Sequence, residues 1–158
     1  DVDRSCILDP LTQPLPFTPF KDFTERSINE INLYSTEMSS ALYSIDRVSA
    51  SANMNNRLSE AIVEAYKSTN GAPISFELML KCYQSRMKDA NNDDSISSVL
   101  KQLVNAHIFE SEDKVSLIDD SYIIKMDGYP KDGPIAKAIV YFLMSKLNNI
   151  YELWINKQ

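Results

Sequence analysis

The feature that most constrains this fold is the order of apolar patterns between Arg57 and Met126. Three successive segments carry apolar residues at spacings of three and four, which is the period of one face of a helix. Short runs rich in β-branched and aromatic residues follow them, and such runs favour strands. The predicted order of elements is therefore helix, helix, helix and β-hairpin.

The three predicted helices have recognisable ends. The first is predicted at 57–69, and Asn70-Gly71 ends it in a turn because both residues tolerate a positive φ. Ser75 caps the second helix, which is predicted to run to position 88, and the third is predicted at 95–106. Their apolar faces are Leu58, Ala61, Ile62 and Ala65 in the first helix, Phe76, Met79, Leu80, Tyr83 and Met87 in the second, and Ile96, Val99, Leu100 and Leu103 in the third.

Three runs in the β-rich part are candidate strands, at 108–109, 115–118 and 122–126. The last two flank Asp119-Asp120-Ser121, a turn sequence, and so predict the hairpin. The pattern leaves open which two of the three runs pair. The predicted fold class is mainly α, with a winged helix of three helices and a short β-hairpin at 53–127.

The charge of this module has the opposite sign to that expected for DNA binding. Segment 93–127 holds eight acids and three bases, which gives a local net charge of −5. The winged helix is best known for holding DNA, and phosphate contacts need Lys or Arg. The acidic balance therefore points to protein partners instead. The acids are Asp93, Asp94, Glu110, Glu112, Asp113, Asp119, Asp120 and Asp127, and the bases are Lys101, Lys114 and Lys125.

The N-terminal segment 1–21 is set apart by prolines at positions 10, 14, 16 and 19. Prolines disfavour helix and favour an extended backbone. Large apolar residues on an extended backbone lie in a groove, either of their own domain or of a partner. A disordered tether is the alternative. The apolar residues are Ile7, Leu8, Leu11, Leu15, Phe17 and Phe20.

Segment 22–52 predicts a heptad-like helix. Asp22 followed by Glu25 has the spacing of a capping box, so the helix is expected to begin there. Its apolar residues recur at spacings of three and four, which suits packing along another helix. Residues 49–56 are weak helix sequence and predict a bend. The apolar seam is Ile31, Tyr34, Met38, Ala41, Ile45 and Val48, with Leu42 beside it.

The C-terminal segment 128–158 predicts a long helix at 134–156. Pro134 suits the first helical position, where its missing N–H costs nothing. The helix would be roughly 35 Å long. A small winged helix cannot cover so long an apolar stripe, so the N-terminal helix, another subunit or a different partner is expected to pack on it. The stripe is Ile135, Ile139, Phe142, Leu143, Leu147, Ile150, Tyr151 and Trp154.

Composition narrows the possible environments and partners. The 158 residues are 44% hydrophobic with a net charge of −6, and the 16 basic residues form no run. This balance disfavours nucleic acid and anionic membrane surfaces. No apolar run reaches the about 20 residues that span a bilayer, and neither a signal peptide nor an initiator Met is present. A fragment of a longer intracellular protein is expected, with Cys6 and Cys82 as free thiols; a disulfide between them is the alternative.

No set of residues predicts catalysis, a metal or a cofactor. His107 is the only histidine, and no Cys or acid pair stands at a spacing that would complete a nucleophile or metal set. Residues 89–93 place oxygen ligands at positions 1, 3 and 5 of a calcium loop. The sixth and twelfth positions, which need Gly and Glu, hold Asp94 and Leu100. A non-catalytic role without cofactors is therefore predicted.

The run ISFELMLKCYQSRMKD…SSVLKQLVNAHIFES…KVSLIDDSYIIKM, within 74–126, resembles the winged helix that closes initiator ATPases of the origin-recognition family and their silencing relatives in yeast heterochromatin. The resemblance lies in the order of elements and the apolar spacing. It implies a place in a nuclear chromatin or replication assembly. The third helix and wing are basic in origin-binding members and acidic here, so the resemblance implies protein contact, as in the silencing relatives.

The predicted function is a protein–protein interaction or dimerisation module within a larger nuclear assembly. One alternative is a DNA-binding transcription or replication factor that reads the major groove with the third helix and uses Lys101, Lys114 and Lys125 as phosphate contacts. Another is a viral or parasite effector that binds a host protein through segment 1–21. The predicted partner-binding residues are large apolar and aromatic side chains, because interface energy concentrates on such anchors. They are Ile31, Tyr34, Met38 and Ile45 in segment 22–52, facing Ile139, Leu143, Leu147, Ile150 and Trp154 in the final helix.

Overall fold

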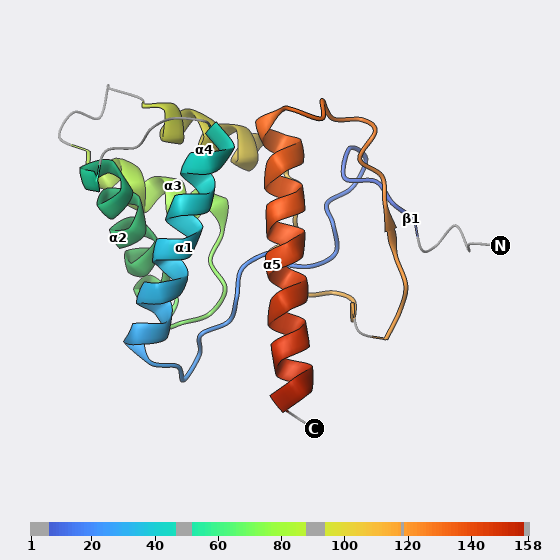
Figure 1. Cartoon of the computed structure of the whole chain (residues 1–158), viewed down its shortest axis with the longest axis horizontal. Coiled ribbons are helices and arrows are strands. Elements are labelled where there is room, and N and C mark those ends of the chain that lie inside the picture. Colours follow the sequence, from blue (N-terminus) through green and yellow to red (C-terminus); the bar gives the residue numbers. More distant parts are fainter. Residues whose placement is uncertain (1–6, 47–51, 88–93, 118, 157–158) are drawn as a thin grey trace. The chain divides into compact units, whose positions relative to one another are not determined.

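The computed structural model describes residues 7–46, 52–87, 94–117 and 119–156. They form five helices and one two-stranded parallel sheet, so the predicted mainly α class is confirmed (Figure 1). The chain folds into two compact units, one of Asp22–Asn105 and one of Asp1–Lys21 with Ala106–Gln158. Residues 53–127, predicted as one winged-helix domain, contribute to both units.

The unit of Asp22–Asn105 is a helical bundle. It contains α1 (Ile28–Asp46), α2 (Ala52–Ser68), α3 (Phe76–Ser85) and nearly all of α4 (Ser95–Ala106). Helix α1 packs along α2, and α2 packs against α3 (Figure 1). The three helices predicted after position 56 are confirmed, although α2 begins earlier, inside the segment predicted to bend. The fully buried large side chains of the unit are Met38, Leu42, Leu58, Ile62, Tyr66, Met79, Tyr83, Ile96 and Leu100.

Helix α1 begins at Ile28 and is capped by Ser27 and Glu30. The Glu30 N–H donates to the Ser27 hydroxyl at 3.3 Å, and the Ser27 N–H donates to the Glu30 carboxylate at 3.2 Å. This reciprocal pair is a capping box, which satisfies two backbone donors that the first helical turn leaves unpaired.

The predicted helix start at Asp22 is wrong. Glu25 has a φ of 62°, a left-handed conformation that the first turn of an α-helix cannot contain. The Asp22 carboxylate instead accepts hydrogen bonds from the N–H of Thr24 at 2.8 Å and from its hydroxyl at 2.6 Å. These bonds lower the pKa of the Asp22 carboxyl, and they close a turn before α1.

The turn between α2 and α3 is held against the segment that precedes α1. Gly71 has a φ of 88°, and its carbonyl oxygen accepts the Phe23 N–H at 2.7 Å. The Phe23 ring packs edge-on against Tyr34 and Tyr66, with ring centroids 5.0 Å away in both cases. A Cβ at position 71 would stand 2.6 Å from the Phe23 carbonyl oxygen. Glycine is therefore required here by both backbone conformation and space.

In the second unit, the N-terminal segment pairs with the chain that follows α4. Strand β1 (Ile7–Leu8) lies parallel to β2 (Ile123–Ile124), with Ile7 opposite Ile123. An isolated parallel bridge joins Leu15 to Phe109. Leu15, Phe17 and Phe20 are buried. For the described residues 7–21, this burial and pairing agree with docking against the same chain rather than with a tether.

The predicted hairpin is not formed among the described residues. Segment 122–126 contributes β2, whose strand partner is β1, and residue 118, at the end of run 115–118, lies outside the described residues. Phe109, in run 108–109, bridges to Leu15 rather than to either of the other runs. These runs were expected to pair with each other. Backbone groups of 108–109 and 122–126 form hydrogen bonds with the N-terminal segment instead. A winged-helix arrangement is therefore not confirmed.

A carboxylate joins three segments of this second unit. The Asp113 carboxylate accepts the Thr18 N–H at 3.0 Å and contacts the Lys146 ammonium with both oxygens, at 2.8 and 2.9 Å. The Lys146 side chain is only 10% exposed, whereas that of Asp113 is 52% exposed. The buried ammonium is therefore stabilised mainly by this carboxylate, whereas the half-exposed carboxylate is also solvated by water.

We predict that Gly71→Ala destabilises the protein by about 2–3 kcal/mol, because it adds the cost of a left-handed non-glycine residue to a backbone overlap. The change would be measured as a shift of the urea midpoint followed by helical circular dichroism. Asn70→Gly is the matched control. Asn70 has a φ of 53° in the same turn, so glycine there should leave the midpoint unchanged or raise it. A midpoint that Gly71→Ala leaves in place would contradict the assigned turn.

We further predict that Asp113→Ala destabilises the protein more than Lys146→Met. The first change leaves a buried ammonium unpaired, which costs on the order of 2–4 kcal/mol. The second leaves a half-exposed carboxylate that water can solvate, and methionine keeps the apolar stem packed. Urea unfolding of both variants at neutral pH tests the order. Equal losses, or a larger loss from Lys146→Met, would show that the pair matters through packing rather than charge.

Candidate interaction surface on α5

Helix α5 (Pro134–Asn156) has the range predicted from the sequence. Pro134 occupies its first position, and the Lys137 N–H donates to the Gly133 carbonyl at 3.2 Å. One face of the helix is buried: the Phe142 ring packs edge-on against Phe20 with centroids 5.6 Å apart. The buried residues of α5 are Ala136, Ala138, Ile139, Phe142 and Lys146.

A second face of α5 is apolar and exposed. Its side chains are separated by four, three, four and three residues, which is the heptad spacing of a helix–helix contact. Each is about half exposed, from 47% at Trp154 to 60% at Tyr151. We call this set the exposed α5 face; it consists of Val140, Met144, Leu147, Tyr151 and Trp154.

The apolar exposure is greatest in the last three turns. After Lys146 no described residue of α5 is buried. Leu153 and Ile155, which lie outside the exposed α5 face, are also about half exposed. The Tyr151 and Trp154 rings stack on each other with centroids 6.2 Å apart. Most helical stability in water comes from packing an apolar face, so an uncovered helix of this composition predicts a contact with another polypeptide.

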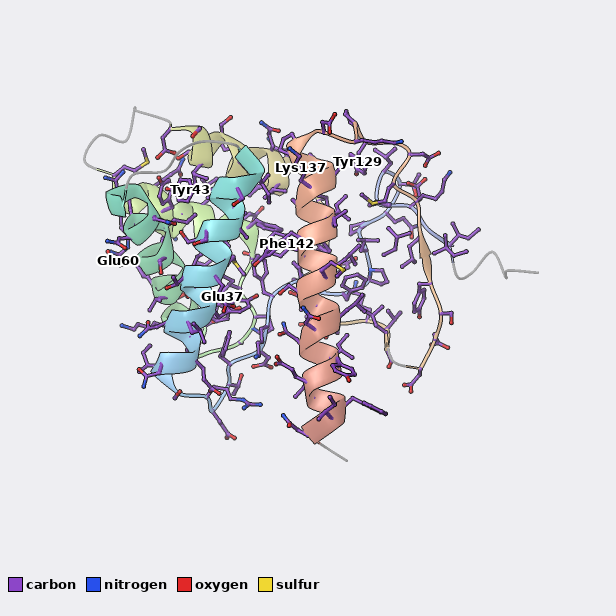
Figure 2. The ribbon with its side chains drawn as sticks, viewed as in Figure 1. Glu37, Tyr43, Glu60, Tyr129, Lys137 and Phe142 are labelled. Atoms are coloured by element: carbon purple, nitrogen blue, oxygen red, sulfur yellow. The ribbon has the colours of Figure 1, made fainter. Side chains whose placement is uncertain are left out.

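A hollow of about 440 Å³ adjoins the N-terminal half of the exposed α5 face. Tyr129 lies before α5 and Lys137 lies in its first turns, near one another (Figure 2). Burial and the nearby Asp9 carboxylate raise the pKa of the Tyr129 hydroxyl. The lining is mostly apolar with two ammonium groups, and consists of Met126, Tyr129, Lys131, Ala136, Lys137, Val140 and Tyr141.

The predicted partner-binding residues divide into three groups. Ile31, Met38, Ile45 and Ile139 are buried within the chain. Leu143, Ile150 and Tyr34 are half-buried, and the Tyr34 ring packs against Phe23 and Tyr66. Leu147 and Trp154 are exposed. A contact of Ile31, Tyr34, Met38 and Ile45 with α5 would join the two units, and it stays a prediction.

Val140 and Met144 were not predicted from the sequence as surface residues. The predicted stripe began at Ile135 and included Ile139, which the structure buries, whereas Val140 is 53% exposed. The available signal was that α5 is apolar around most of its circumference. A helix of that kind either is buried on all sides or has a second face to cover.

The other chemical candidates are His107, Cys82, Cys6 and the calcium-like residues 89–93. His107 directly follows α4, has a φ of 47° and is exposed. Cys82 is a free, buried thiol, while Cys6 and the calcium-like residues 89–93 lie outside the described residues. Among the residues described, no three of His, Cys, Asp or Glu are grouped so as to hold a metal ion. No helix of the described part is long and apolar enough to cross a membrane.

The charges of segment 93–127 are partly used inside the chain. Lys114, one of the lysines proposed for phosphate contact, lies 3.3 Å from the Glu110 carboxylate. Asp94 accepts the Ser97 N–H at 2.8 Å in the first turn of α4, and it also accepts the Tyr83 hydroxyl. These pairs reduce the charge available to an external partner.

Comparison with protein-family models, with curated proteins and with solved structures finds no match to this chain. The resemblance to the winged helix of origin-recognition ATPases is therefore untested.

We predict that the Cys82 thiol reacts slowly with a maleimide at pH 7–8. Burial, and secondarily the Glu64 carboxylate, raise the pKa of this thiol, so less reactive thiolate is present than for an ordinary cysteine. The rate should rise with pH and should increase on unfolding in urea. Cys6→Ser isolates the signal. A native rate equal to the unfolded rate at pH 7 would contradict the burial.

Proposed function

We propose that this protein is a non-catalytic interaction module that self-associates by burying the exposed α5 face. The observation that carries this proposal is the part of α5 after Lys146, which has exposed apolar side chains and no buried residue. Two helices that each present this heptad-spaced face would cover one another. The simplest partner is a second copy of this chain, because its α5 presents apolar side chains at the same heptad spacing.

The exposed α5 face supplies much of the area of a dimer contact. Its five side chains are about half exposed. At roughly 200 Å² for each large side chain when fully exposed, they offer about 500 Å², and the apolar lining of the adjoining hollow adds to this toward the about 800 Å² that each partner buries in a standard interface. A tryptophan and a tyrosine stand at one end, and such residues dominate interface energetics.

The nuclear setting, in a chromatin or replication assembly, forms part of this proposal. It rests on the resemblance of 74–126 to the winged helix of origin-recognition ATPases and their silencing relatives. The winged-helix class is proposed on the same resemblance, with α2, α3 and α4 as its helices. The acidic balance of segment 93–127 favours protein partners over DNA in that setting.

We predict that the unmodified chain is a dimer at micromolar concentration and that Leu147→Asp makes it a monomer. Burying an unpaired carboxylate between two helices should raise the Kd by about 100-fold or more. Light scattering after size-exclusion chromatography, over a range of loading concentrations, measures the mass directly.

Asn148→Asp is the matched control, since it adds the same charge at the next, exposed position outside the face. It should leave the mass unchanged. A wild-type chain that remains monomeric at several hundred micromolar would overturn the proposed self-association. A dimer that Leu147→Asp leaves intact would place the interface elsewhere.

A further inference from the structure

We infer that the two copies pair antiparallel, with Trp154 of each copy seated in the Met126–Tyr129–Tyr141 hollow of the other. This inference rests on the proposed self-association and specifies its geometry. It assigns an occupant to a hollow that the fold itself leaves empty. Shape and charge are distributed unevenly along α5, and both favour this pairing.

The exposed α5 face differs at its two ends. Near its start, Val140 borders the hollow of about 440 Å³. Near its end, the stacked rings of Tyr151 and Trp154 protrude, about half exposed. A parallel pair would oppose hollow to hollow and aromatic to aromatic. An antiparallel pair opposes the bulky end of one copy to the hollow end of the other, which is the more complementary arrangement.

The heptad spacing also fixes a register. The residues of the exposed α5 face alternate between the two apolar heptad positions, a and d. In an antiparallel pair, an a residue of one helix packs opposite a d residue of the other. Pairing Met144 with Leu147 of the second copy then pairs Val140 with Tyr151. The same register sets Trp154 opposite Lys137, a residue that lines the hollow. Every side chain of the exposed α5 face is covered in this register.

The charges favour the same orientation. Lys131 and Lys137 line the hollow, and neither has an ion-pair partner among the described residues. Their ammonium groups would meet the C-terminal turn of the other copy's α5, whose free carbonyls carry the negative end of the helix dipole. An ammonium beside an indole ring adds a cation–π attraction at Trp154. Parallel pairing would instead bring like charges together at this end.

Crosslinking between two single-cysteine additions tests the orientation in the full chain. Val140→Cys and Tyr151→Cys proteins would be mixed, treated with a short thiol-specific crosslinker, and mapped by mass spectrometry. The inference predicts a 140–151 link between copies and no 140–140 link, since antiparallel copies hold the two 140 positions about 16 Å apart along the axis. A dominant 140–140 link means parallel pairing and overturns the inference.

The single tryptophan tests the seating of the ring. Trp154 is the only tryptophan of the chain, so its emission should shift to shorter wavelength as protein concentration drives dimerisation. Trp154→Ala should raise the dimer Kd by at least about tenfold. Leu153→Ala is the matched control, because Leu153 is about half exposed on the same turn but off the face; it should change the Kd less than about threefold.

The outcomes separate this inference from the proposed function. A dimer that Leu147→Asp dissociates, but that links 140 to 140 or leaves Trp154 emission unshifted, overturns the inference and supports self-association through α5. A dimer that forms neither the 140–151 nor the 140–140 crosslink overturns the inference. The mass of the Leu147→Asp variant then tests the proposed function. A chain that is monomeric at all concentrations overturns both.

Discussion

The Asp113 carboxylate is the point on which the second unit depends. It receives a backbone N–H from Thr18 and the ammonium of Lys146, so it connects the N-terminal segment, the chain after α4 and helix α5. A buried ammonium needs a partner, because its desolvation is otherwise uncompensated. Lys146 is also the last buried residue of α5. The ion pair therefore marks the end of the covered part of that helix, and the uncovered part beyond it is the candidate interface.

The proline-rich segment can serve as a strand partner in this unit because its backbone hydrogen bonds use the N–H of a non-proline residue and carbonyl groups, which prolines also have. Leu15, between Pro14 and Pro16, donates its N–H to Ile108 and accepts the N–H of Glu110. The carbonyl of Pro16 accepts the N–H of Lys114. Prolines lack only the donor, so an isolated bridge can include them where a central strand could not. The extended backbone also places Phe17 and Phe20 in the core.

Local signals in the sequence predicted α3, α4 and α5 well. Ser75 and Pro134 mark helix starts through hydrogen bonding and φ preference, which involve only neighbouring residues. The start of α1 was missed because two candidate caps lie five residues apart, and the left-handed backbone at Glu25 excludes the first. The hairpin was not found because each strand partner comes from the far N-terminal segment. Ile7 pairs with Ile123, and no periodicity records a pairing over that distance.

The same distinction applies to the candidate site. The sequence by itself determined that the chain is mainly helical, that its last helix is long and apolar, and that Leu147 and Trp154 stand at heptad-related positions. It could not show that Ile139 is buried while Val140 and Met144 are exposed, because an apolar helix has more than one face able to pack. Only the tertiary structure decided this: Phe20 and Asp113 contact one side of α5, and Val140 and Met144 lie exposed on another.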